Sequence, residues 1–228
     1  MTELTRRGDV FVLDISDPDL ADDDHRLTYE RIAAIDAALT EVEASDGPAA
    51  LVVTARGKFF SNGLVPELFV EPAYTPAYQR LVARFLVSEV PTVGALNGHC
   101  YAGALLFALA FDERYARTER GFHCLPEAAI KVPFTAGLAA LAMARLAPQV
   151  AHRAMVLATR FDAESALEAG ILDAVVPVEE LLDAAVARAG ELAPLRGPVL
   201  GSIKLARYAD VVDALHRTET LSIEGATA

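Results

Sequence analysis

The sequence predicts an α/β protein whose parallel sheet is covered by helices on both faces. Short apolar runs, typical of buried strands, alternate with longer stretches in which apolar residues recur every three or four positions. Strands that are connected through helices lie parallel, and such sheets are buried on both sides. In addition, 53% of the 228 residues are hydrophobic, so the chain can bury a large core.

The first half of the chain repeats a strand–helix–strand pattern. The first helix-like stretch, at 27–42, follows a strand and a turn and places Ile32, Ile35 and Leu39 on one face, as an amphipathic helix requires. The pattern predicts, in order, a strand at 8–15, a turn at 16–18, a helix at 27–42, a strand at 49–54, a helix at 78–87, a strand at 92–96 and a very apolar helix at about 103–110.

The second half is predicted to be mostly helical. Its expected elements are a short strand at 113–117, helices at 135–146, 150–157, 163–169 and 178–192, a small strand at 171–176 and, after a break at 194–198, a last helix at 199–216. No linker or low-complexity stretch interrupts the chain, so we predict a single domain over 1–228. Its core occupies about 1–134 and a mostly helical region follows at about 135–228. The last ten residues lack apolar periodicity and are expected to fray.

Charge and cysteine content narrow the class of protein. The net charge of −12 argues against a nucleic-acid or anionic-membrane binder, because either would need a basic face. Cys100 and Cys124 lie in apolar surroundings without metal-ligand spacing, so we expect buried free thiols and no metal site. The sequence shows no secretory apolar segment and no apolar run of about 18 residues that could cross a bilayer. We therefore predict a cytoplasmic protein.

Four short motifs carry a resemblance to a known family. They read G-K-F-F-S-N-G-L at 57–64, N-G-H-C-Y-A-G-A at 97–104, G-F-H-C-L-P-E at 121–127 and A-L-E-A-G-I-L-D-A-V-V-P at 166–177. Their order and spacing resemble the crotonase superfamily of enoyl-CoA hydratases and isomerases over about residues 10–195. The K-F-F-S-N-G form is most similar to the monofunctional isomerases that convert 3-enoyl-CoA to 2-enoyl-CoA. The resemblance implies a crotonase-like spiral of β-β-α units followed by a helical trimerisation region.

The resemblance also implies an oxyanion hole. In this superfamily two backbone N–H groups bind the thioester oxygen, and the matching donors here are those of Leu64 and Gly103. Removing a proton beside a thioester places negative charge on this oxygen, and each fixed donor stabilises it by roughly 3–4 kcal/mol. Gly63 suits the same loop because glycine readily adopts positive φ. The alternative is that Gly63 and Gly103 serve only tight turns or close packing.

Glu127 is the candidate catalytic residue. It follows Leu125-Pro126 and precedes an apolar stretch, so its carboxylate is expected to face a pocket with little water. Loss of solvation raises the pKa of a carboxyl and makes it a better base near neutral pH. It also matches the family's catalytic glutamate. A helix-start or surface role is the alternative for a glutamate after proline.

Leu106 marks a departure from the hydratases. Those enzymes carry a second glutamate in the pattern G-G-G-C-E, whereas this chain reads A-G-A-L-L at 102–106. Hydration needs a water held between two carboxylates, but moving a double bond needs only one group that takes and returns a proton. The sequence therefore favours isomerisation, unless Glu67 or Glu71 supplies the second carboxylate.

Other residues are candidates for contact with coenzyme A by resemblance alone. Arg56, Lys58 and Lys204 would contact its phosphates through charge-assisted hydrogen bonds, and Asn62 would offer its backbone carbonyl to the adenine. Each cation is otherwise a solvated surface charge. Coenzyme A would be part of the substrate, and no metal or redox cofactor is expected.

The combined expectation is an enoyl-CoA isomerase that assembles as a homotrimer or a dimer of trimers. Two alternatives remain open from the residues. One is another crotonase reaction, such as hydration, thioester hydrolysis or carbon–carbon bond cleavage. The other is an acyl-CoA-binding subunit without catalytic activity, which the alanines at positions 102 and 104 of a normally glycine-rich turn would suit.

Overall fold

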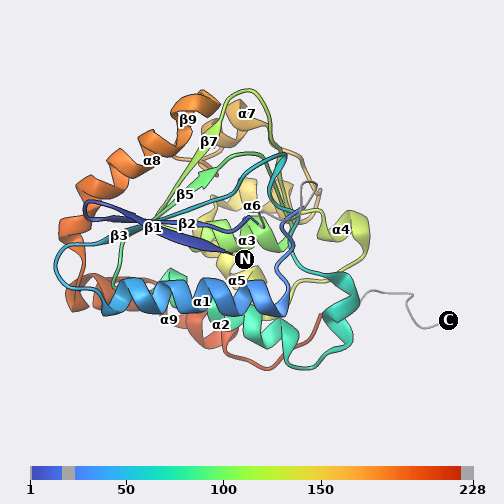
Figure 1. Cartoon of the computed structure of the whole chain (residues 1–228). Helices are drawn as coiled ribbons and strands as arrows, with labels where there is room; N and C mark the ends of the chain where they lie inside the picture. Colours follow the sequence, from blue (N-terminus) through green and yellow to red (C-terminus); the bar gives the residue numbers. More distant parts are fainter. Residues whose placement is uncertain (1, 17–23, 222–228) are drawn as a thin grey trace.

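The computed structural model describes residues 2–16 and 24–221 and has two sheets with helices packed around them (Figure 1). Most of the expected turn at 16–18 and most of the tail that we expected to fray lie outside these residues. The larger sheet has the strand order β1-β2-β3-β5-β7-β9. Its strands are Glu3–Arg7 (β1), Val10–Asp14 (β2), Ala50–Thr54 (β3), Thr92–Leu96 (β5), Glu113–Arg117 (β7) and Ala174–Val176 (β9).

The larger sheet is parallel apart from the β1–β2 hairpin. Alternate residues of the central strands point to opposite faces. Val12 and Val52 face α8 (Val178–Leu192), where they pack near Ala185. Leu13 and Leu51 face the other core, which is covered by α1 (Tyr29–Ala44), α2 (Tyr74–Leu86) and α3 (Gly103–Leu109). Burial of both faces confirms the predicted covered parallel sheet.

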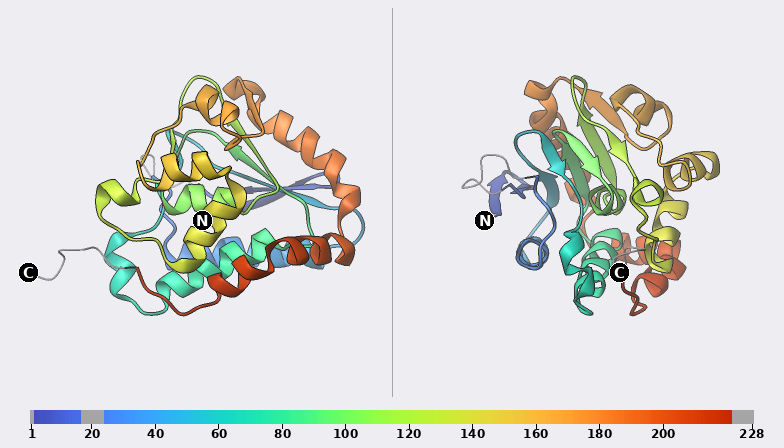
Figure 2. Two further views of the ribbon diagram at one scale, coloured as in Figure 1. Left: turned by 180° about the vertical axis from the view of Figure 1, so that it is seen from behind. Right: turned by 90° about the vertical axis from the view of Figure 1, so that its right-hand side faces the viewer.

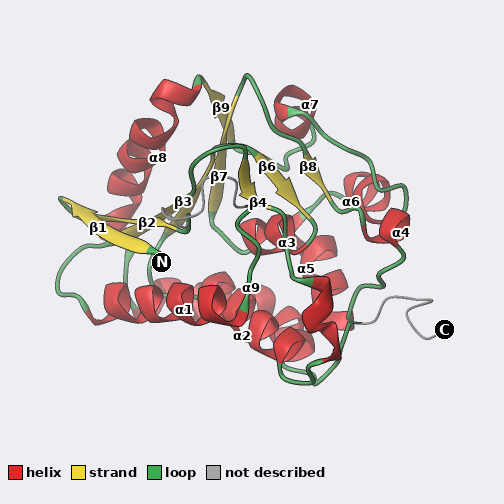
Figure 3. Cartoon of the chain, turned by 45° about the vertical axis from the view of Figure 1, so that its right-hand side comes forward, coloured by secondary structure: helices red, strands yellow, loops and turns green. Residues whose placement is uncertain are grey.

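A second, smaller sheet consists of three short parallel strands, shown side by side in Figure 3. They are Phe59–Ser61 (β4), His99–Tyr101 (β6) and His123–Cys124 (β8). Each follows one strand of the larger sheet and precedes a helix, which gives the successive units β3-β4-α2, β5-β6-α3 and β7-β8-α4, where α4 is the short helix Glu127–Ile130. This arrangement confirms the predicted spiral of β-β-α units.

The C-terminal part supplies helices that pack against this spiral. They are Ala136–Arg145 (α5), Pro148–Met155 (α6), Ala163–Glu168 (α7) and Pro198–Leu215 (α9), in addition to α8. Helix α9 runs beside α2 and α5 (Figure 2). Thr135 caps α5 by accepting a hydrogen bond from the Leu138 N–H, which is the usual role of threonine at a helix start. Within the described ranges, no helix is long and apolar enough to cross a membrane.

Several elements differ from the prediction. Strand β1 was not predicted, because its residues are largely exposed and lack apolar alternation. Helix α2 begins at Tyr74 rather than at 78, since Pro76 lies in its first turn, where the missing N–H is not needed. A 3-10 helix at Pro66–Val70 (η1) was also not predicted. The strand expected at 171–176 covers only Ala174–Val176.

Candidate active site

The three residues that the sequence singled out for catalysis follow the three strands of the small sheet. Leu64 comes shortly after β4, Gly103 after β6, and Glu127 after β8. Because these strands are parallel neighbours, their carboxyl ends meet at one edge of the sheet. All three residues line one pocket of about 420 Å³. Residues far apart in the sequence are thus brought together as expected.

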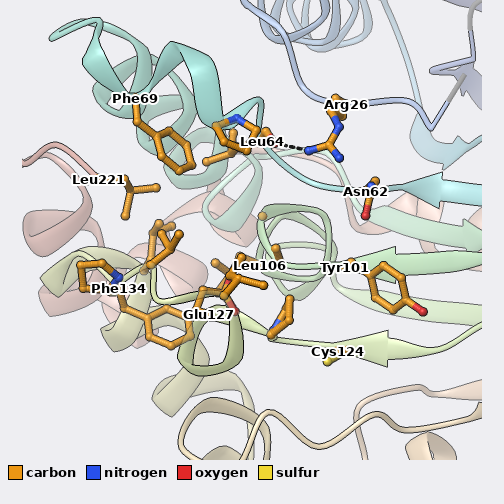
Figure 4. A pocket seen from close by; sticks show the side chains of 18 of the residues that line it. Arg26, Asn62, Leu64, Phe69, Tyr101, Leu106, Cys124, Glu127, Phe134 and Leu221 are labelled. Carbon is orange, nitrogen blue, oxygen red and sulfur yellow. Dashed lines mark hydrogen bonds between the residues drawn. The ribbon is translucent and has the colours of Figure 1, made fainter. Parts of the chain in front are cut away.

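The pocket has a mainly apolar wall and a more polar one. In Figure 4, Phe69, Phe134 and Leu221 lie on one side and Arg26 and Asn62 on the other. Glu127 and Leu106 lie between these groups in the same view. The described lining residues also include Pro66, Tyr101, Ala102, Cys124, Pro126, Ile130, Val132, Pro133, Leu138 and Arg160. Such a pocket suits an apolar chain that carries one polar group.

Two glycines let the loops after β4 and β6 touch. Gly63 has φ +85°, and a methyl group placed on it would lie 2.8 Å from the Tyr101 carbonyl oxygen and 3.0 Å from the Gly103 nitrogen. A methyl on Gly103 would lie 2.9 Å from Cγ of Leu64 and 3.4 Å from its nitrogen. Neither position has room for a side chain without movement of the opposite loop. These glycines therefore serve close packing as well as a turn, and the packing sets the distance between the two loops.

Polar contacts hold the loop after β4. The Ser61 hydroxyl donates to the His25 carbonyl oxygen at 2.7 Å and accepts from the Gly63 N–H at 3.1 Å. The Gly63 carbonyl in turn accepts from the Leu27 N–H at 2.8 Å. Among the described residues, the N–H groups of Leu64 and Gly103 donate to no other group. Both amides therefore lie at the pocket with their donor capacity unused.

Ala102 adopts a backbone conformation that favours glycine. Its φ and ψ are 51° and −125°, and such values cost an alanine on the order of 1–3 kcal/mol. The surroundings hold it there, because its N–H donates to the Cys124 carbonyl at 2.9 Å and its carbonyl accepts from the Leu106 N–H at 3.1 Å. The strained residue immediately precedes Gly103 and also lines the pocket.

Glu127 is buried, with 5% of its surface exposed. Burial raises its pKa to about 7, although a hydrogen bond from its own backbone N–H opposes this shift. Its Oε2 atom has no hydrogen-bond partner in the described part of the chain. It begins the short helix α4 (Glu127–Ile130), which directs the carboxylate into the pocket. A carboxyl with this pKa can take up and release a proton near neutral pH.

Leu106 occupies the position expected from the sequence. It lies on α3, is 2% exposed and lines the pocket. Glu67 and Glu71, the alternative sources of a second carboxylate, are both exposed and lie outside the lining. The 3-10 helix η1 instead contributes Pro66 and Phe69 to the pocket. Among the described lining residues, Glu127 is the only carboxylate.

The cations expected near coenzyme A are not part of the pocket lining. Arg56 pairs with Asp14 at 2.5 Å and with Glu3 at 3.2 Å. The Lys58 ammonium lies 5.4 Å from the centre of the Phe59 ring. Asn62, in contrast, does line the pocket, and its side chain donates to Oδ2 of Asp24 at 2.8 Å.

Lys204 has a partner inside the protein. It is 6% exposed, and its Nζ lies 2.7 Å from Oδ2 of Asp112. It is therefore neither a solvated surface charge nor part of the pocket lining. The structure gives it an internal ion pair in place of the free ammonium group that a phosphate contact would require.

Two arginines that were not predicted also line the pocket. Arg26 donates from Nη1 to the Leu64 carbonyl at 3.1 Å and from Nε to Oδ2 of Asp24 at 2.9 Å. Arg160 lines the pocket from the loop before α7. Both come from loops without a motif, so no signal in the sequence distinguished them from other surface arginines.

The polar groups of the described residues include no candidate metal centre. In the ranges that the structure describes, no group of three or more His, Cys, Asp or Glu side chains could hold a metal ion. Cys100 and Cys124 are free and buried, as predicted. Cys124 lines the pocket, and burial raises the pKa of its thiol to about 11, so it is a poor nucleophile at neutral pH.

Comparison with known proteins agrees with this geometry. The model of the enoyl-CoA hydratase/isomerase family matches residues 10–222. Enoyl-CoA delta isomerase 3 of Arabidopsis thaliana is 30% identical over 227 residues, covering 92% of this chain and 93% of the relative. The peroxisomal enoyl-CoA delta isomerase 2 of the same plant is 32% identical and covers 94% of this chain and 95% of its own. Other relatives are named as enoyl-CoA hydratases.

Solved structures give the same result. The apo structure of an enoyl-CoA isomerase from Mycobacterium tuberculosis has a TM-score of 0.85 and 26% identity, covering 95% of each chain. A hydratase/isomerase family protein from Pseudomonas syringae has a TM-score of 0.86 and 26% identity, covering 94% of this chain and 93% of its own. With the spiral of β-β-α units and the family match over most of its length, this chain belongs to the enoyl-CoA hydratase/isomerase family and has the crotonase fold.

Proposed function

We propose that this protein isomerises 3-enoyl-CoA thioesters to 2-enoyl-CoA thioesters. The observation that carries the proposal is the pairing of one buried carboxylate, Glu127, with an apolar residue, Leu106, in a pocket that also contains two unused backbone donors. The similarity to plant isomerases of nearly the same length supports it.

In the proposed reaction, the deprotonated Glu127 removes a proton from C2 of the substrate. The electrons of the broken C–H bond form a C1–C2 double bond, and negative charge moves to the thioester oxygen. The N–H groups of Leu64 and Gly103 stabilise this charge as hydrogen-bond donors. Protonated Glu127 then gives its proton to C4, the double bond shifts to C2–C3, and the thioester carbonyl re-forms. The carboxylate ends as it began, so no other reactant is consumed.

The environment of Glu127 suits both halves of this proton transfer. With a pKa of about 7, a large fraction of Glu127 is ionised at neutral pH and can act as a base. The protonated form is a stronger acid than an aqueous ammonium group, which helps it to give its proton to C4. The route needs neither a metal nor a redox cofactor. Coenzyme A enters as part of the substrate.

The same pocket is poorly suited to hydration. Adding water across a double bond requires a water molecule that is held and split between two carboxylates, and Leu106 offers no polar atom for this purpose. Glu67 and Glu71 are exposed outside the lining. The pocket therefore favours the reaction in which one proton is moved within the substrate.

The phosphates of coenzyme A are proposed to bind near Arg160, an exposed cation that lines the pocket, whereas Arg26 is already paired with Asp24. Lys58 and Arg56 remain candidates for contacts farther from the thioester, and Asn62 for the adenine.

We also propose a homotrimer or a dimer of trimers. This proposal is supported by exposed apolar side chains on or next to α5, α6 and α9, including Met143, Val156, Leu157, Val199 and Ile203.

The test is a product assay with purified protein and a 3-enoyl-CoA. Isomerisation produces a conjugated thioester and a rise in ultraviolet absorbance, which Glu127→Gln should reduce by about 10²–10⁴-fold. The Glu67→Gln variant is the matched control and should keep full activity. Loss of absorbance from 2-enoyl-CoA, release of free thiol or cleavage of the acyl chain would assign one of the other crotonase reactions. Binding without turnover of any of these thioesters would assign a non-catalytic subunit.

A further inference from the structure

Helix α2 carries two tyrosines that reach both donor loops without lining the pocket. Tyr74 and Tyr78 are four residues apart, so they lie on the same face of the helix, and both are fully buried. A buried tyrosine hydroxyl generally has a hydrogen-bond partner, and the choice of partner shows which backbone groups it holds.

Tyr74 holds the loop that presents Leu64. Its hydroxyl accepts from the Val65 N–H at 2.9 Å and donates to the Leu27 carbonyl at 2.5 Å. The Leu27 N–H donates to the Gly63 carbonyl at 2.8 Å. The residues on both sides of Leu64 are therefore tied, directly or through Leu27, to one tyrosine.

Tyr78 holds the other donor. Its hydroxyl donates to the carbonyl of Gly103 at 2.5 Å. Gly103 is the first residue of α3, so this bond ties the start of that helix to α2. The two tyrosines thus connect one rigid helix to both donor residues.

If the two tyrosine hydroxyls only stabilised the fold, hydrogen-bond partners anywhere in the core would suffice. Here Tyr74 binds the N–H of Val65, which follows Leu64, and Tyr78 binds the carbonyl of Gly103 itself. The two loops also touch each other through Gly63 and Gly103. A shift of either loop would change the distance between the two donors. We infer that Tyr74 and Tyr78 are positioning residues that fix the two oxyanion donors relative to each other. This inference rests on the proposed function of the Leu64 and Gly103 amides.

The test uses Tyr74→Phe, Tyr78→Phe and the double variant. The matched control is Tyr208→Phe, which removes a hydroxyl that accepts from Arg145 Nη1 at 2.7 Å and is not part of the pocket lining. Two probes are titrated into each protein. Acetoacetyl-CoA forms an enolate that absorbs in the near ultraviolet and needs both donors, whereas butyryl-CoA is a saturated thioester that does not enolise appreciably.

We expect enolate binding to weaken by about 5–30-fold in each single variant, less than the 10²–10³-fold cost of removing a donor outright. Butyryl-CoA affinity should change by less than about twofold in all variants, because it places little charge on its oxygen. Tyr208→Phe should also lower the melting temperature, because it removes a hydrogen bond, yet its enolate affinity should match wild type.

Three results would overturn the inference. Unchanged enolate affinity in folded single variants, with a lowered melting temperature, would assign both hydroxyls to fold stability only. An equal loss of affinity for both probes would indicate a general distortion of the pocket. If the wild-type protein binds butyryl-CoA but no enolate, the proposed oxyanion hole is itself wrong and there is no donor pair to position. The single variants decide the question even if the double variant does not fold.

Discussion

The burial of Glu127 predicts a pH dependence of stability that a single substitution should remove. Its pKa in the folded protein is about 7, above the ordinary value of 4.5 that the unfolded chain has. The folded state therefore holds the proton more tightly, and the stabilisation is present in full below pH 4.5 and lost as the pH rises through 7. Between pH 5 and 8 this loss amounts to about 2.5 kcal/mol of unfolding free energy, worked from these two pKa values.

Glu127→Gln has no proton to release, so its unfolding free energy should lack this decline. The assay is chemical denaturation of both proteins at a series of pH values between 5 and 8. The difference between the two curves isolates Glu127, because other buried groups such as His123 are present in both proteins. The same carboxyl predicts that kcat/KM of the wild type falls about tenfold per pH unit below pH 7, since the base becomes protonated.

Parallel stability curves for the two proteins would refute the reasoning, because they would mean that the carboxyl titrates alike in the folded and unfolded states. A kcat/KM of the wild type that stays constant down to pH 5 would also refute it, because the folded carboxyl would then have a pKa below 5. Glu67→Gln, at an exposed position outside the pocket, is the control and should reproduce both wild-type profiles.

Four further outcomes are expected. Leu106→Glu should permit weak hydration of 2-enoyl-CoA while lowering stability by several kcal/mol, and a melting temperature equal to wild type would contradict the burial of that position. Ala102→Gly should raise the melting temperature because it relieves an unfavourable φ, whereas Ala104→Gly within helix α3 should lower it. Lys204→Ala should destabilise the protein by about 1–3 kcal/mol because Asp112 loses its ion-pair partner and keeps only its hydrogen bonds from Thr92; a raised KM for acyl-CoA at unchanged stability would instead favour a phosphate contact. Sedimentation at micromolar concentration should show a trimer or hexamer, and a monomer would contradict the assembly proposed from the apolar surfaces of α5, α6 and α9.

The sequence predicted the larger sheet well because its signal is local. Residues of β2, β3 and β5 are apolar on both faces, which is typical of a covered parallel sheet. The strands of the small sheet have two or three residues, too few to show any periodicity. They are strands because of their neighbours, and only the family resemblance indicated them. Strand β1 is an exposed edge and gave no apolar signal.

The candidate site shows the same difference between local signals, which the sequence contains, and long-range contacts, which it does not. Leu64, Gly103, Leu106 and Glu127 were found from motifs, and all four line the pocket. The ion pair of Lys204 was not predicted, because its partner, Asp112, is distant in sequence and spacing carries no information about such a pair. The tyrosines of α2 and Arg26 were not predicted for the same reason, since they contact backbone groups that are distant in sequence.

The location in the cell stays a prediction. The sequence favoured the cytoplasm, but two of the Arabidopsis thaliana relatives carry the word peroxisomal in their names. Fractionation of the source cells, with the protein detected by antibody, would test it.

The proposed activating groups of this pocket are main-chain amides, whereas the groups that would select the reaction are side chains. A point mutation can replace Glu127 or Leu106 but cannot delete the N–H of Leu64 or Gly103, except by introducing proline. The pocket could therefore lose or exchange one chemistry while keeping its capacity to polarise a thioester. The amide donors are inherited with the fold, whereas the side chains at positions 106 and 127 can change during evolution. Directed evolution toward new thioester reactions should therefore vary these two positions and leave the loops of Leu64 and Gly103 unchanged.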